Sequence, residues 1–232
     1  MTHSTGTARV IVVPGLAVHA YAELPVQHLR DNGYDASLLQ PPAWRGVEHD
    51  LERYGRNLAA DIDRDGVPVD VLIGLSAGTQ AAAVAASLTD LVKRLVLVSP
   101  TIDPAYRSMI KQLVVFVAKG DPHDKAAFFS QVPDWSRAGI LRLFRGFASA
   151  IPLHLEDVLP QVTAAVTIIH AEHDQLTTQA YAASLAETNG ARLVLMPGVG
   201  HSWPKADSAR FLRFIDELVC GRASGREGDG DI

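Results

Sequence analysis

The chain has 232 residues, of which 47% are hydrophobic, and this is enough for one domain with a sizeable core. Its formal net charge of −5 argues against a nucleic-acid-binding protein, which would carry a basic surface. The single cysteine, Cys220, excludes a disulfide scaffold and a cysteine-rich zinc module. No apolar run reaches the ~18 residues of a membrane span, and the N-terminal segment lacks a signal-peptide pattern. We therefore expect a cytoplasmic monomer or homodimer with no membrane or nucleic-acid partner.

Short apolar runs rich in Val, Ile and Leu recur along the chain, as they do in strands that are buried on both faces. Helical patterns lie between these runs, and strands that alternate with helices form a mostly parallel sheet through right-handed crossovers. The sequence therefore predicts an α/β fold with a mostly parallel, doubly wound sheet of about six strands. The predicted strands are residues 9–13, 36–40, 69–73, 94–98, 166–170 and 192–196.

The connection between the fourth and fifth strands, residues 99–165, is far longer than a simple crossover needs, and such an excursion is often functional. Asp103-Pro104 is typical of a helix start, and that helix is expected to end at Gly120. A second helix is expected from Asp134 towards Ala150. Its predicted apolar side consists of Ile140, Leu143, Phe144 and Phe147, and its other side carries Arg142 and Arg145. The two arginines could receive a substrate carboxylate or phosphate, although a solvated helix face explains them more simply.

These patterns divide the chain into one domain over residues 1–220, with a small helical cap inserted at about 101–160, and a tail. An apolar stripe from Phe211 to Val219 predicts the terminal helix, and Gly221 is typical of its C-cap. The tail, residues 221–232, is rich in glycine and lacks large apolar residues before Ile232, so we predict that it is disordered.

A possible nucleophile lies in Gly74-Leu75-Ser76-Ala77-Gly78, directly after the third predicted strand and before an alanine-rich helix. A sharp strand-to-helix turn strains its central residue, and glycines two positions away on either side let the backbones pass. The Ser76 hydroxyl would then lie at the carboxyl end of the sheet, where doubly wound folds bind ligands. The alternative is a serine that merely begins a helix after a glycine turn.

A serine needs a base and an acid that orients it, and His201 and Asp174 have suitable positions. Both follow late strands, His201 in a Gly-Val-Gly-His loop and Asp174 four residues after a predicted strand end. The alternative for His201 is a loop histidine packed beside Trp203. Asp103 and Glu172 compete for the role of the acid, although Asp103 is better explained as a helix cap. The run 170–174 could suggest a metal site, but no further His/Asp cluster accompanies it, so we expect no metal and no cofactor.

With these residues in the order Ser–Asp–His, the chain resembles the α/β-hydrolase superfamily from about Arg9 to Val219. The resemblance implies a catalytic triad of Ser76, Asp174 and His201, and it implies that two N-terminal antiparallel strands usual in the family are missing. It also implies an oxyanion hole made by the backbone amides of Leu16 and Ala77. The family commonly has His-Gly-x before the first of these donors, and this chain has Pro14 in place of the histidine.

The expected reaction is acyl transfer from a small-molecule substrate to water, with an acyl-enzyme on Ser76 and the cap enclosing the substrate. A small, largely apolar carboxylic ester, lactone or thioester would fit. Alternatives that use the same residues are a dedicated thioesterase, an acyltransferase or cyclase, and a carbon–carbon bond hydrolase. A non-enzymatic ligand receptor with retained triad residues also stays open, and turnover of a generic ester would separate it from the enzymes.

Overall fold

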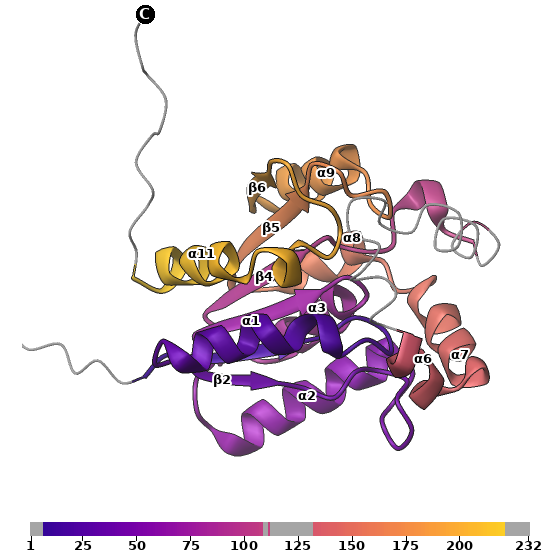
Figure 1. Cartoon of the computed structure of the whole chain (residues 1–232), viewed down its shortest axis with the longest axis horizontal. Helices are drawn as coiled ribbons and strands as arrows, with labels where there is room; N and C mark the ends of the chain where they lie inside the picture. Colours follow the sequence, from indigo (N-terminus) through magenta and orange to yellow (C-terminus); the bar gives the residue numbers. More distant parts are fainter. Residues whose placement is uncertain (1–6, 109–110, 112–131, 221–232) are drawn as a thin grey trace, which may run out of the picture.

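A computed structural model describes residues 7–108, 111 and 132–220 of the chain (Figure 1). Its centre is a six-stranded sheet in which every pair of neighbouring strands is parallel, in the order β2-β1-β3-β4-β5-β6. The predicted α/β fold with about six mostly parallel strands is therefore confirmed. The strands are β1 (Arg9–Val13), β2 (Asp35–Leu38), β3 (Val71–Leu75), β4 (Arg94–Val98), β5 (Ala165–Ala171) and β6 (Arg192–Met196).

Alternate side chains of β1, β3, β4 and β5 enter two separate cores, which explains why these strands are almost continuously apolar. In β1, Val10 and Val12 face one core, and Ile11 and Val13 face the other. The first core lies under α1 (Ala20–Asp31), α10 (Trp203–Ala206) and α11 (Ser208–Cys220). The second lies under α2 (Leu51–Asp65), α3 (Gly78–Leu88) and α9 (Gln179–Asn189). The helices thus cover both faces of the sheet.

The largest difference from the predicted strands is at β3, which runs to Leu75 instead of ending at residue 73. Gly74 and Leu75 pair with Leu97 and Val98 of β4, so the ladder continues to the residue before Ser76. The predicted start of the strand at Val69 forms only an isolated bridge to Val92. Ser76 therefore follows the carboxyl end of the strand directly.

The long connection after β4 contains η1 (Pro104–Tyr106), α6 (Val132–Ala138), α7 (Ile140–Ala150), α8 (Leu155–Val158) and η2 (Leu159–Gln161). The helix predicted from Asp134 to Ala150 is in fact two helices, because Gly139 between them has a φ of +79°, which favours glycine. The rest of the helix predicted to end at Gly120, the C-cap at Gly221 and the predicted disordered tail lie outside the described residues.

The four residues of the predicted apolar side of α7 are only partly turned inward. Leu143 and Phe147 pack against the core, but Ile140 and Phe144 are 82% and 56% exposed. The inward side of the helix is completed by Gly146 and Ala150, which are both buried. These small residues let α7 lie close to the sheet domain, and its outer side keeps apolar residues of its own.

Candidate functional site

Ser76 occupies a sharp turn between β3 and α3, with a left-handed φ of +52°. The glycines on either side of it are required by close packing. A Cβ on Gly74 would come within 2.6 Å of the Thr79 Cα, and one on Gly78 would overlap the carbonyl oxygens of Val13 and Pro14. The turn is pinned from outside by a 2.9 Å hydrogen bond from the Ser76 amide to the Val98 carbonyl. The strained serine is thus held by the surrounding backbone.

His201 joins Ser76 to Asp174 through its two ring nitrogens. Nε2 lies 3.0 Å from the Ser76 Oγ, and Nδ1 lies 2.9 and 3.0 Å from the two carboxylate oxygens of Asp174. With the proton on Nδ1, the imidazole donates to the carboxylate and leaves Nε2 free to accept the proton of the serine hydroxyl. Residues that are 125 and 27 positions apart in the chain therefore form one hydrogen-bonded series.

The Asp174 side chain is completely buried, yet it is held in its charged form. Burial alone would raise its pKa, but the attraction of His201 and the hydrogen bonds that the carboxylate accepts outweigh burial and bring the pKa below its usual value. Besides His201, the amides of Leu176 and Thr177 donate to it, at 2.9 and 3.2 Å. An ionised carboxylate at this position can fix the orientation of the imidazole.

The two competitors for the acid bind other groups. Asp103 is buried, and it accepts hydrogen bonds from the Ala105 amide and from both the amide and the hydroxyl of Thr178. It therefore caps η1 and anchors the start of α9. Glu172 accepts a 2.7 Å hydrogen bond from the Gly198 amide in the loop before His201. Asp174 is the carboxylate that the fold brings to His201.

The two backbone amides expected to form an oxyanion hole flank Ser76. Ala77 follows it in the turn, and the loop that carries Leu16 lies beside it, since a Cβ on Gly15 would be 3.4 Å from the Ser76 Cβ. Among the described residues, neither the Leu16 nor the Ala77 amide donates a hydrogen bond, whereas the neighbouring amides of Ala17 and Val18 do. Both amides thus lack an acceptor among the described residues, as donors to an oxygen of a bound molecule would.

Helices α6 and α7 are fastened to the loops around Ser76. A Cβ on Gly146 would come within 2.5 Å of a Leu16 side-chain carbon, so α7 lies directly on the loop before α1. Arg142 donates to the carbonyl oxygens of Ala43 and Val47, which excludes the simple solvated face predicted for it. Gln80 of α3 donates to the carbonyl of Ala150, the last residue of α7, and to that of Leu153 just beyond it.

Asp134 is the buried anchor of α6. One of its carboxylate oxygens accepts hydrogen bonds from the amides of His19 and Ala20, at 2.8 and 2.9 Å. These amides begin α1, and the N-cap residue His19 supplies no side-chain cap of its own. A carboxylate from another helix therefore caps α1, where the partial positive charge of the helix end favours it. Because α1 follows the Leu16 loop directly, this contact also fixes the position of that loop.

We expect Asp134→Ala to lower stability by about 1–3 kcal/mol, because two partly buried amides lose their acceptor. Since the Leu16 loop would be held less firmly, kcat should fall on the order of tenfold while KM changes less. Thermal unfolding and steady-state kinetics measure the two effects. Asp157→Ala, at a carboxylate whose side chain is 79% exposed, is the matched control and should change neither. A loss of stability with unchanged kcat would show that Asp134 holds only the helix.

His170 on β5 is a second buried histidine near Asp174 and His201. It is 2% exposed, and among the described residues its Nδ1 has no hydrogen-bond partner. Burial lowers its pKa below the ordinary 6.5, and the charge of His201 lowers it further, although Asp174 acts in the opposite direction. The unfolded chain therefore binds a proton at His170 more readily than the folded protein does.

This difference makes stability depend on pH. The free energy of unfolding should fall as pH drops through about 6.5, and the loss should be complete below the folded pKa of His170. His170→Gln should flatten this part of the curve. Urea unfolding at several pH values tests it, with the range above about pH 8 as the internal control, because His170 is neutral there in both states. Parallel curves for the two proteins at all pH values would contradict the assignment.

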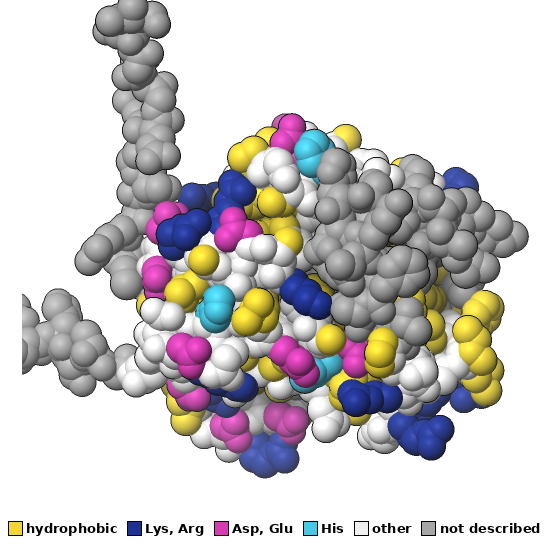
Figure 2. Space-filling model, in the orientation of Figure 1, with side chains coloured by type: hydrophobic (Ala, Val, Ile, Leu, Met, Phe, Trp, Pro, Cys, Tyr) yellow, Lys and Arg dark blue, Asp and Glu magenta, His cyan; other side chains and the backbone are white. Residues whose placement is uncertain are grey.

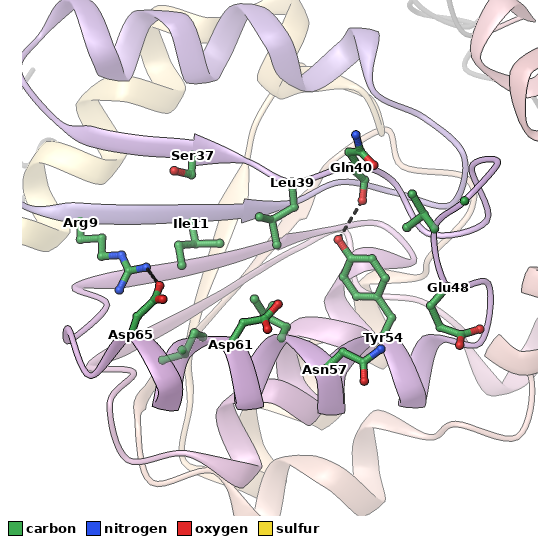
Figure 3. A pocket seen from close by; sticks show the side chains of 14 residues that line it. Arg9, Ile11, Ser37, Leu39, Gln40, Glu48, Tyr54, Asn57, Asp61 and Asp65 are labelled. Atoms are coloured by element: carbon green, nitrogen blue, oxygen red, sulfur yellow. Dashed lines mark hydrogen bonds and ion pairs between the residues drawn. The ribbon is translucent and has the colours of Figure 1, made fainter.

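A cavity of about 440 Å³ opens elsewhere, between α2 and the β1–β2 side of the sheet (Figure 3). None of its lining residues belongs to the Ser76 site. The polar groups at its two ends already bind each other: Arg9 pairs with Asp65, and the Tyr54 hydroxyl donates to the Gln40 carbonyl (Figure 3). Within residues 7–108, 111 and 132–220, there is no group of three or more His, Cys, Asp or Glu side chains that could hold a metal ion.

Sequence reasoning located Ser76, His201 and Asp174 but missed the role of Asp134, the partners of Arg142 and the contact of Gln80. Asp134 was expected only to begin a helix, and its partners lie 114 and 115 positions away in the chain. No local pattern signals such a pairing, because any polar residue near a helix start fits the same pattern.

Comparison with known proteins agrees with this architecture. The model of a family described as "Alpha/beta hydrolase family" matches residues 10–214. A hydrolase from Oleispira antarctica superposes with a TM-score of 0.78 at 14% identity, covering 94% of this chain and 92% of that chain. An enol-lactonase from Burkholderia xenovorans LB400 superposes with a TM-score of 0.71 at 13% identity, covering 94% of each chain. An esterase from Exiguobacterium antarcticum superposes with a TM-score of 0.69 at 19% identity, covering 93% of each chain. At these identities the likeness establishes the fold alone. No curated protein matches the sequence.

Proposed function

Because this chain belongs to the alpha/beta hydrolase family, we propose that it is a serine hydrolase which cleaves a small carboxylic ester, lactone or thioester. The observation that carries the proposal is the hydrogen-bonded series from Asp174 through His201 to Ser76. It lies at the carboxyl ends of parallel strands, where this type of fold binds ligands. Among the structurally similar proteins, one is named an enol-lactonase, one an N-acyl homoserine lactone degrading enzyme and two are named esterases.

In the first half of the proposed reaction, the Ser76 Oγ attacks the carbonyl carbon of the substrate while His201 Nε2 takes the hydroxyl proton. The carbonyl oxygen becomes negatively charged, and the amides of Leu16 and Ala77 donate to it. His201 then gives the proton to the leaving oxygen or sulfur as the bond to the carbonyl carbon breaks. An acyl group remains on Ser76, and the leaving group departs as an alcohol or thiol; in a lactone it stays attached to the acyl chain.

The second half releases the acyl group. Water gives a proton to His201 as its oxygen attacks the acyl carbon, and the same two amides again receive the negative charge. The proton returns to the Ser76 Oγ, and a carboxylic acid leaves. Asp174 stays ionised throughout and stabilises the charged imidazole, which agrees with the direction of its pKa shift.

We assign α6 and α7 to a cap over this site. The contacts of Gly146 with Leu16 and of Asp134 with the start of α1 support this assignment, since both join these helices to the loop that supplies one proposed oxyanion donor. Arg142 is not expected to bind a substrate anion, because its guanidinium is engaged by the carbonyls of Ala43 and Val47.

The test is a substrate screen with p-nitrophenyl esters, lactones and acyl thioesters of increasing chain length, with and without added alcohol or amine acceptors. Hydrolysis that Ser76→Ala abolishes is the expected result. A fluorophosphonate should label the wild-type protein at Ser76, as peptide mass spectrometry would show. Faster transfer to an added acceptor than to water would instead indicate an acyltransferase. If no substrate were turned over and Ser76 were not labelled, the proposal would be contradicted and a receptor would be favoured.

A further inference from the structure

Helix α7 has a second apolar face that points away from the protein. Ile140, Leu141 and Phe144 are 82%, 61% and 56% exposed, more than any other large hydrophobic residue in the described part of the chain. They share one side of the helix, because positions i, i+1 and i+4 fall within about 100° of arc. The other exposed large hydrophobic residues are Leu24, Val67, Leu88 and Leu195, which lie on separate elements. A contiguous exposed patch of this kind marks an interaction surface.

The charged residues of α7 are all positive. The helix contains two arginines, Arg142 and Arg145, and no Asp or Glu, in a chain whose net charge is −5. Arg142 holds the loop at residues 43–47, whereas Arg145 is exposed beside the apolar residues. Arg137 belongs to α6, where it pairs with Asp134 at 3.7 Å. Arg45 is exposed in the loop that Arg142 holds. In Figure 2, hydrophobic side chains gather at the right-hand edge, where α7 lies in Figure 1, with Lys and Arg side chains below them.

We propose that this outer face of α7 (Ile140, Leu141, Phe144 and Arg145) docks on an anionic lipid surface. The helix would lie in the plane of the interface, with its apolar side chains at the acyl boundary and Arg145 against lipid phosphates. The sequence-based expectation of no membrane partner rested on the absence of a spanning segment, and a helix that lies on the surface needs none. No helix within the described residues is long and apolar enough to cross a membrane.

A second copy of the chain fits this face less well. A stable dimer interface takes about 800 Å² and roughly 20–30 residues from each partner, far more than three apolar side chains provide. A two-fold interface would also bring Arg145 of both copies together, without an acidic residue on α7 to oppose them. An anionic surface instead supplies the missing negative charge.

The test is flotation of the full-length protein with vesicles of phosphatidylcholine alone or mixed with phosphatidylglycerol. Binding to the anionic vesicles is expected, and it should weaken with salt. Leu141→Ser/Phe144→Ser should lower the partition coefficient about tenfold or more, and Arg145→Gln about fivefold. Val67→Ser/Leu88→Ser is the matched apolar control, and Arg56→Gln, at a side chain that is 58% exposed, is the charge control. Circular dichroism should show that all variants are folded.

The proposal is independent of the proposed function, because Ser76→Ala should bind vesicles as the wild type does even when it hydrolyses nothing. Equal binding to neutral and anionic vesicles, no binding at all, or equal losses in the controls would overturn it. Sedimentation velocity without lipid tests whether the face instead joins two copies of the chain. A dimer that Leu141→Ser/Phe144→Ser dissociates would show that the face joins two copies of the chain and would also overturn the proposal.

Discussion

Ser76→Ala should lower kcat/KM for any substrate found in the screen by on the order of 10⁴-fold or more, while the fold stays intact. The turn depends on close contacts at Gly74 and Gly78 and on the bond between the Ser76 amide and Val98, none of which involves the hydroxyl. The left-handed φ of +52° is already imposed on a residue that has a Cβ. Alanine therefore removes the proposed nucleophile and little else.

Steady-state kinetics measures the expected loss of kcat/KM, and thermal unfolding tests whether the fold stays intact. Ser87→Ala, on α3 but away from the turn, is the matched control and should keep full activity. Its hydroxyl donates to the Val84 carbonyl of its own helix, so it should also have little effect on stability. A Ser76→Ala protein with near wild-type turnover would show that another group is the nucleophile.

The second large effect is expected at Asp174, where asparagine should lower kcat by on the order of 10⁴-fold. The asparagine side chain is neutral and has one acceptor oxygen instead of two. His201 therefore loses the partner that fixes its tautomer and stabilises its charged form. Asp103→Asn is the matched comparison, since Asp103 is also a buried aspartate after a strand, but it binds Ala105 and Thr178. It should cost about 1 kcal/mol of stability and change kcat little.

The two variants are separated by measuring kcat and the melting temperature of each. Asp174→Asn should move mainly kcat, and Asp103→Asn should move mainly the melting temperature, by about 2–4 °C. If Asp103→Asn were the more damaging to kcat, the working acid would belong to the end of β4, and the hydrogen bonds of His201 to Asp174 would have another purpose.

The sequence determined the features that depend on neighbouring residues. The nearly continuous apolar runs predicted strands buried on both faces, and the sheet has them, with Val10 and Val12 on one side of β1 and Ile11 and Val13 on the other. The Gly-Leu-Ser-Ala-Gly run after such a strand predicted the turn at Ser76 for the same reason, because tight backbone crossings require glycine at fixed offsets.

Tertiary structure alone decided which distant groups meet. Asp103, Glu172 and Asp174 all follow strand ends, and only packing shows that Asp174 reaches His201 while the others bind Thr178 and Gly198. The break at Gly139 likewise could not be read from periodicity, since an isolated glycine is tolerated within a helix.

The inward side of α7 was also settled by packing. The helix carries apolar residues on two sides, and periodicity cannot choose between them. The contacts of Gly146 with Leu16 and of Arg142 with Ala43 turn one side inward and leave Ile140 and Phe144 outside. The cap of α1 by Asp134 depends on a pairing across 115 positions, which local propensity does not encode. Local backbone and hydrophobic preferences thus fixed the strands and the serine turn, and long-range hydrogen bonds and close packing fixed the partners around them.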